Sequence, residues 1–122
     1  MIGTPYEDPY EEIMKKYPKL FSNLSYVECA DGWADLIDKV SRRIHLINNS
    51  YENKEDGVFA AQIKEKFGGL RYYVDINGLL DHDRAQVETF ISEAEKMSYS
   101  ICTGCGKTKD AKIKRCPNCS TR

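Results

Sequence analysis

The sequence lacks a long hydrophobic run, a second tryptophan and an excess of charge of either sign. Its 122 residues include one tryptophan and four prolines and carry a formal net charge of −1. No apolar stretch approaches the roughly 20 residues that a membrane-spanning helix needs, and no apolar signal-peptide segment follows the first residues. We therefore expect a cytoplasmic protein that neither inserts into a membrane nor coats nucleic acid through bulk positive charge.

A recognisable catalytic set is also missing. No nucleophile is placed with a base in the sequence, and His45 and His82 have no partners at metal-ligand spacing. The composition, with 41% hydrophobic and 30% charged residues, is that of a globular domain. We expect one α+β domain over residues 1–100, a cysteine-rich tail over residues 101–122, and a protein that acts by binding rather than by catalysis.

Three helices are expected in the domain. Asp8-Pro9 has the form of a helix start, and that helix ends before Pro18. A second helix has Asp31 as its N-cap, and a third is expected over residues 81–99. The second helix carries an apolar stripe at helical spacing, made of Trp33, Leu36, Ile37, Val40, Ile44 and Ile47. In the third helix the inner face is expected to include Val87, Phe90, Ile91, Ala94 and Met97.

Two segments rich in β-branched and aromatic residues, 58–67 and 70–76, flank Gly68-Gly69. A glycine pair between two such segments predicts a β-hairpin with a two-residue turn. The predicted fold is therefore α+β, with helices packed on a small antiparallel hairpin or sheet and a metal-binding tail at the C-terminus.

Four of the five cysteines form two CxxC pairs separated by ten residues. Four thiolates at this spacing suit tetrahedral Zn²⁺, and a site filled by four protein ligands is structural rather than catalytic. The sequence predicts a zinc ribbon with the ligands Cys102, Cys105, Cys116 and Cys119. Cys29 stands apart and is expected to be a small buried residue.

The hairpin register predicts an anion site. With Gly68-Gly69 as the turn, Lys66 faces Arg71, a like-charge pair that is unfavourable by up to about 1 kcal/mol. Ammonium and guanidinium groups bind phosphate, an aromatic ring stacks on a flat base, and glycines allow close approach. The residues predicted to bind an anionic ligand are Lys64, Lys66, Gly68, Gly69, Arg71 and Tyr73. The alternative is that the cations extend into water or pair with acidic residues of the N-terminal helix.

Two further residues are candidates for supporting this site. The same register places Glu65 on the apolar face between Ile63 and Phe67, where a carboxylate needs a partner such as an arginine of the second helix or Tyr72. Trp33 opens the second helix, whose N-terminus favours anions. The alternatives are a structural pairing or a chemical role for Glu65, and a core position for Trp33.

The stretches ECADGWADLID, QIKEKFGGLRYYVD and AEKMSYSICTGCG resemble a family of small proteins carried by phages, prophages and bacteria. The resemblance extends from about Cys29 to Gly106, and KEKFGGLRYYV is its most specific part. This chain has CPNC in its tail, where some relatives end in a different Cys/His arrangement. The resemblance implies a phage-associated accessory factor in the bacterial cytoplasm and carries over no catalytic residue.

Three functions follow from these observations. The first is a binding protein that captures a nucleotide-type anionic ligand, such as a host defence signalling nucleotide, on the cationic hairpin face. The second is a nucleic-acid-binding zinc-ribbon protein, since the chain from Cys102 onward has six basic residues and one acidic residue. The third is an interaction module that inhibits or adapts a host protein.

Overall fold

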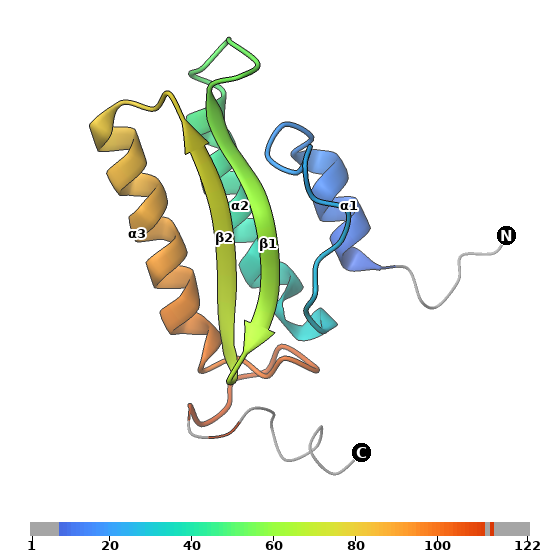
Figure 1. Ribbon diagram of the computed structural model, residues 1–122. Helices are drawn as coiled ribbons and strands as arrows, with labels where there is room; N and C mark the ends of the chain where they lie inside the picture. Colours follow the sequence, from blue (N-terminus) through green and yellow to red (C-terminus); the bar gives the residue numbers. More distant parts are fainter. Residues whose placement is uncertain (1–7, 112, 114–122) are drawn as a thin grey trace, which may run out of the picture.

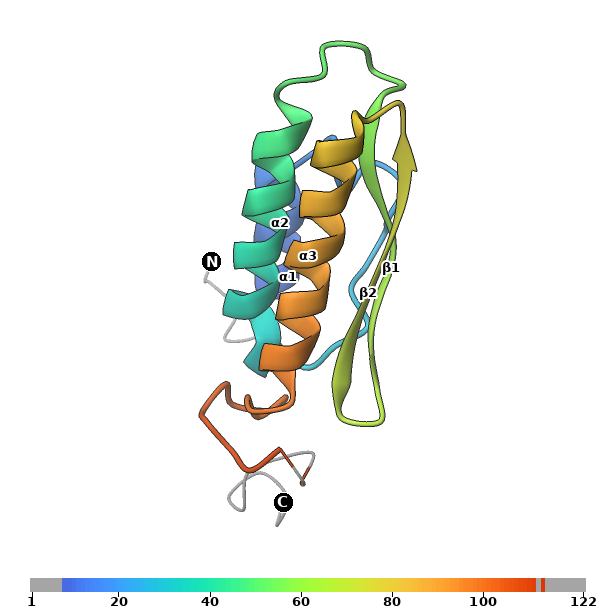
Figure 2. The same ribbon diagram turned by 90° about the vertical axis from the view of Figure 1, so that its left-hand side faces the viewer.

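The computed structural model describes residues 8–111 and residue 113. Its elements follow one another as α1 (Pro9–Lys16), the 3-10 turn η1 (Asp31–Trp33), α2 (Ala34–Asn48), β1 (Gly57–Lys66), β2 (Gly69–Asn77) and α3 (Asp81–Ser98) (Figure 1). The antiparallel hairpin of β1 and β2 forms one layer, and α2 and α3 lie side by side against one of its faces (Figure 2). The predicted α+β class is confirmed.

The two N-terminal helices begin in different ways. Asp8 caps α1 as predicted, because its carboxylate accepts a hydrogen bond from the backbone N–H of Tyr10 at 2.9 Å. The prediction that Asp31 caps α2 is wrong: Asp31 belongs to η1, no side-chain capping bond is made, and Trp33 is the N-cap of α2. The predicted apolar stripe of α2 is buried along its whole length.

The core lies between the inner face of the hairpin and the helices. Ile63, Leu70 and Tyr72 are each at most 5% exposed, and burial of such side chains stabilises a fold by roughly 1.5–3 kcal/mol each. The hydroxyls of Tyr72 and Ser41 of α2 lie 2.8 Å apart in a buried hydrogen bond. Burial raises the pKa of Tyr72, so its hydroxyl stays neutral.

The sheet also departs from a plain hairpin at β1. The register shifts between Ala60 and Gln62, which is the mark of a β-bulge. The chain before η1 covers the outer edge of β1. The N–H of Ala60 donates to the carbonyl of Leu20 at 2.7 Å, and the N–H of Glu28 donates to the carbonyl of Ile63 at 2.8 Å. Backbone groups that would invite pairing with another chain are thereby satisfied.

Helix α3 packs with only part of its predicted inner face. Val87 and Ala94 are buried, whereas Met97 is 51% exposed, so its assignment to the inner face is wrong. Among the described residues, no helix is both long and apolar enough to cross a bilayer.

Candidate functional site

The turn of the hairpin is formed by Phe67-Gly68, one residue earlier than predicted. Lys66 pairs with Gly69, and φ is +56° at Phe67 and +82° at Gly68. A two-residue loop with positive φ at both positions is a type I′ turn. The predicted Gly68-Gly69 turn is therefore wrong, and so is the pairing of Lys66 with Arg71, because Arg71 pairs with Lys64.

Glu65 closes this turn. Its carboxylate accepts a hydrogen bond from the N–H of Gly68 at 2.6 Å, and its side chain is exposed. Glu65 pairs with the buried Leu70 and so lies on the predicted apolar face, but the prediction that its carboxylate is buried is wrong, because the side chain is exposed beside the turn. Tyr72, one of its predicted partners, uses its hydroxyl on Ser41 instead. The role that the geometry shows for Glu65 is structural.

We call the side of the hairpin that faces away from α2 and α3 the outward face. The register places on it Gln62, Lys64, Lys66, Arg71, Tyr73 and, towards the far end of β2, Asp75. Arg71 is held there by α3, since its Nη1 donates to Oε2 of Glu95 at 2.8 Å. The Glu95 carboxylate offsets the like charge of Lys64, which pairs with Arg71 across the strands. Pairing with an acidic residue, the alternative weighed for these cations, is therefore found for Arg71, but its partner comes from α3 rather than from α1.

The residues after the turn fasten the hairpin tip to the C-terminal end of α3. A Cβ atom on Gly69 would lie 2.4 Å from the ring and hydroxyl of Tyr99, so only glycine permits this contact. The N–H of Leu70 donates to Oγ of Ser98 at 2.9 Å in a buried position. The second glycine of the FGGLR segment thus has a packing role that is independent of any ligand.

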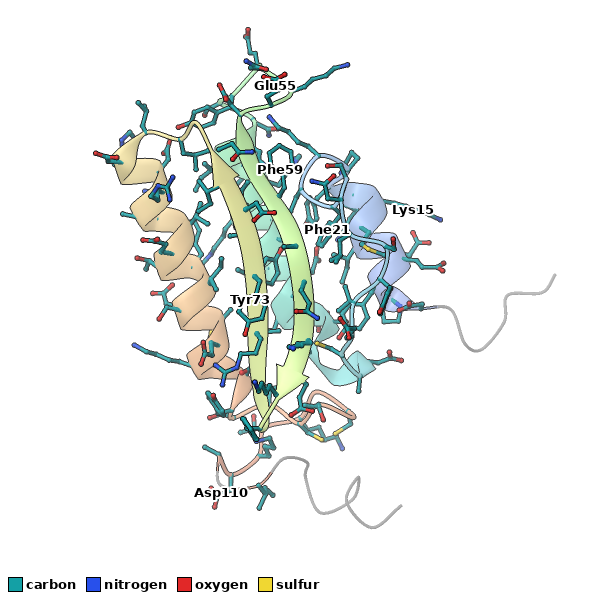
Figure 3. All side chains as sticks on the ribbon, in the orientation of Figure 1. Lys15, Phe21, Glu55, Phe59, Tyr73 and Asp110 are labelled. Atoms are coloured by element: carbon teal, nitrogen blue, oxygen red, sulfur yellow. The ribbon has the colours of Figure 1, made fainter. Side chains whose placement is uncertain are left out.

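Lys64 and Lys66 are the remaining cations of the outward face. Among the residues that the structure describes, neither forms an ion pair, and Nζ of Lys66 lies 5.6 Å from the centre of the Phe67 ring. Phe67 is 76% exposed in the turn. Tyr73, which pairs with Gln62, is 46% exposed and lies midway along the hairpin (Figure 3). The two lysines of the outward face therefore lie, along the hairpin, between the exposed Phe67 at the tip and the exposed Tyr73.

The second candidate feature is the cysteine turn, residues Cys102–Gly106. The N–H of Gly104 donates to Sγ of Cys102 at 3.4 Å, and the N–H of Gly106, at φ +81°, donates to the carbonyl of Cys102 at 2.9 Å. Cys102 is buried and Cys105 is exposed. A tight turn with an N–H directed at a sulfur is the form expected for half of a CxxC zinc site.

Gly32 and Trp33 dock the cysteine turn onto the domain. The N–H of Gly32 donates to the carbonyl of Thr103 at 2.8 Å, and Nε1 of the fully buried Trp33 donates to the carbonyl of Ile101 at 3.0 Å. A Cβ atom on Gly32 would lie only 2.2 Å from the carbonyl oxygen of Cys102. Trp33, predicted as a possible support of the anion site, makes its polar contact with the cysteine turn, which matches the core alternative.

Lys109 of the tail is buried rather than solvated, at 8% exposure. Its ammonium group donates to the backbone carbonyls of Tyr99, Ile113 and Asp110. A cation at this position complements the unpaired carbonyls and the negative dipole end of α3. This tail lysine therefore serves the fold rather than a partner.

The predicted metal site extends beyond the described residues, because Cys116 and Cys119 lie outside them. Within residues 8–111 and 113, no three His, Cys, Asp or Glu side chains are grouped so as to hold a metal ion. Cys29, predicted as a buried residue, is half-buried. Burial, with the charges of Glu65 and Glu28, raises the pKa of its thiol to about 12.

Among the hollows of the described residues, two adjoin α2. One of about 210 Å³ lies beside the cysteine turn and is lined by Asp31, Asp35 and Cys105 among others. The other, of about 110 Å³, lies between α2 and α3 and is lined by residues that include Arg43 and Phe90. Neither hollow is lined by the lysines of the outward face, whose aromatic neighbours are exposed to solvent.

Sequence reasoning missed three residues of the outward face and its support. Glu95 and Ser98 receive the hairpin, but nothing in the local sequence of α3 indicates which strand residues they contact. The predicted register puts Phe67 on the apolar face, because the run Phe67-Gly68-Gly69 allows two positions for a two-residue turn and the glycine pair is the more common turn sequence. One feature of the sequence does favour the observed turn. With the tip at Phe67-Gly68, the carboxylate of Glu65 is close enough to accept a hydrogen bond from a backbone N–H of the turn.

No protein-family model, curated protein or solved structure matches the chain. The function is therefore argued from the site's own residues.

Proposed function

We propose that this protein binds a phosphate-bearing ligand on its outward face, with Lys64 and Lys66 as the anion-binding groups. The observation that carries the proposal is that neither ammonium group has an ion-pair partner among the described residues, whereas the neighbouring Arg71 is paired with Glu95. The two lysines are two residues apart on one face of β1, and therefore roughly 7 Å apart along the strand. Two like charges so close together are favoured when an anion lies between them.

The nucleotide-type ligand expected from the sequence, including a host defence signalling nucleotide, is one member of this ligand class. A phage-associated accessory role in a bacterial cytoplasm is the corresponding proposal for context. Arg71 is a supporting group here, because its ion pair with Glu95 orients the guanidinium along the same face.

We propose in addition that Cys102 and Cys105 supply half of a structural Zn²⁺ site that Cys116 and Cys119 complete. The residues present fit this metal, because the N–H of Gly104 directed at Sγ of Cys102 favours the thiolate form that zinc binds. The metal would supply folding energy to the tail and take no part in ligand chemistry. Elemental analysis of the purified chain is expected to give one zinc per chain, and Cys105→Ser is expected to reduce that content.

Calorimetry with the full chain tests the phosphate proposal. The panel contains mononucleotides, cyclic nucleotides, ADP-ribose-type nucleotides and a ten-residue oligothymidylate. We expect at least one member to bind, and the double variant Lys64→Glu/Lys66→Glu to weaken that binding at least about tenfold, because two charge-assisted contacts are lost.

The matched control is Lys39→Glu/Lys54→Glu, which changes the net charge equally at exposed positions outside the hairpin. It is expected to keep the wild-type affinity within about threefold, because a remote change in net charge acts only through long-range, salt-screened effects. Absence of binding for the whole panel, or equal affinity of the two double variants, would contradict the proposal.

A further inference from the structure

We infer that the phosphate-bearing ligand is a single-stranded nucleic acid, whose phosphates contact Lys64 and Lys66 and whose bases stack on Phe67 and Tyr73. This inference rests on the proposed function and adds the class of ligand. It is carried by the conformation of Phe67, by the order of charged and aromatic side chains along the outward face, and by the openness of that face.

Phe67 occupies a backbone conformation that its side chain disfavours. At φ +56° it lies in the left-handed region, where a bulky residue is an outlier. Asparagine or glycine would fill the first position of a type I′ turn without this strain. The ring is 76% exposed and so contributes little to the core. The left-handed conformation of this bulky residue, rather than its exposure alone, is what points to a contact with a ligand.

Tyr73 supplies a second ring at a fixed distance from the first. It lies four residues from Gly69 at the tip, which is about 13 Å along the strand, and Lys64 and Lys66 lie on the same face of the neighbouring strand. A stacked single strand rises about 3.4 Å per nucleotide, so this stretch accommodates at most about four nucleotides. Cations that follow a backbone, together with aromatic side chains that accept bases, are the common design of single-strand binding surfaces.

The shape of the surface favours a strand over an enclosed ligand. Sites for small nucleotides are concave and bury most of the ligand, whereas Phe67 and Tyr73 are exposed and the two lysines line neither hollow described above. In a duplex the base faces are stacked inside and cannot reach the two rings without being flipped out. A single strand presents both its phosphates and its base faces to an open surface.

Fluorescence anisotropy tests this inference with the full chain and a labelled ten-residue oligothymidylate or oligouridylate. The logarithm of the binding constant is expected to fall with the logarithm of the salt concentration, with a slope of about −1.4 or steeper. Each of the two lysine–phosphate contacts to a single strand contributes about −0.7 to that slope. Phe67→Ala and Tyr73→Ala are each expected to weaken binding about 5- to 150-fold, the range for one stacked base. Tyr73→Phe keeps the ring and is expected to bind within about threefold of wild type.

The controls separate the two proposals. Leu46→Ala removes an exposed apolar side chain from α2 and is expected to leave the affinity unchanged. Equal affinity of Tyr73→Ala and Tyr73→Phe, or equal affinity for a duplex of the same length, would overturn the single-strand inference and leave phosphate binding in place. Wild-type affinity in Lys64→Glu/Lys66→Glu would overturn both. Thermal unfolding of each variant establishes that it is folded. If one alanine variant is not folded, the other alanine variant and the comparison of single-stranded with duplex DNA carry the test.

Discussion

The substitution Phe67→Asn is expected to stabilise the protein while it weakens ligand binding. Phe67 is the first residue of the type I′ turn, at φ +56°, and its ring is largely exposed. Asparagine tolerates this conformation, and Asn-Gly is the preferred sequence for such a turn. The proposed ligand contact would account for a residue that lowers stability and is nevertheless exposed.

The size of the effect follows from the structure. A left-handed conformation costs an ordinary L-residue about 1–2 kcal/mol, and asparagine avoids much of that cost. The substitution also removes the contact between the Phe67 ring and Nζ of Lys66 at 5.6 Å, which is worth about 0.5–1 kcal/mol at an exposed site. The expected net gain is about 0.5–1 kcal/mol. With an unfolding entropy of about 2.1 cal/mol/K per residue, Tm rises by about 2–4 °C.

Scanning calorimetry on the full chain, purified with zinc in the buffer, measures this shift, and Phe67→Ala is the matched control. Alanine removes the ring but keeps a Cβ atom in the left-handed region, so no gain in Tm is expected. A Tm of Phe67→Asn that falls below that of wild type by more than about 2 °C would refute the reasoning, since it would mean that the ring packs on the domain or that the turn has another geometry.

Three other outcomes follow from the described contacts. Gly32→Ala is expected to lower the free energy of unfolding, measured in urea, by about 2 kcal/mol or more. The added Cβ atom would lie 2.2 Å from the carbonyl oxygen of Cys102 and would break the hydrogen bonds that dock the cysteine turn. A change below about 0.5 kcal/mol would contradict this docking. Arg71→Met is expected to change stability by less than about 1 kcal/mol and, since Glu95 already neutralises much of the guanidinium charge, to weaken ligand binding less than Lys64→Glu/Lys66→Glu does. A loss of binding as large as that of the double variant would instead identify Arg71 as the main anion-binding group. Cys29 is expected to react with iodoacetamide at pH 8 roughly 1000-fold more slowly in the native than in the urea-unfolded chain. The thiolate is the nucleophile, and the pKa of this thiol rises from 9.0 to about 12 in the fold. Equal reaction rates, measured by mass spectrometry, would show that the thiol is not protected.

The helices and the core were largely predictable, because their signals are local or periodic. Asp8-Pro9 marks the start of α1, and the stripe from Trp33 to Ile47 has the period of a helix that packs on one side. Met97 continued the same period on α3 and is nevertheless exposed. Periodicity reports which residues share a face but does not report where the partner element ends.

The hairpin tip could not be read in full from the sequence, because the choice between two turns depends on contacts from other parts of the chain. Gly69 is committed to the ring of Tyr99, and Glu65 satisfies the N–H of Gly68. Both contacts favour the turn at Phe67-Gly68 over the glycine pair. The sorting of the charges onto one face was correct, since both registers place Lys64, Lys66 and Arg71 on the same side of the strands.

The link between the DGW segment and the cysteine turn was also beyond the reach of pattern reasoning. Trp33 and Ile101 are separated by 68 positions in the chain. The sequence around a core tryptophan does not indicate which backbone carbonyl accepts the hydrogen bond from its indole N–H. Only the small size of Gly32 hinted at a close backbone approach, and the approach it allows is to Cys102.

The most direct test of ligand binding on the outward face is an amide NMR titration of the ¹⁵N-labelled full chain with the ten-nucleotide oligothymidylate. We expect the largest changes in chemical shift over residues 62–73, with Lys64, Lys66 and Tyr73 among the most affected, and little change along α2. Changes confined to the hollow between α2 and α3 or to the hollow beside the cysteine turn, with the hairpin amides unmoved, would contradict the proposal that the outward face is the binding surface.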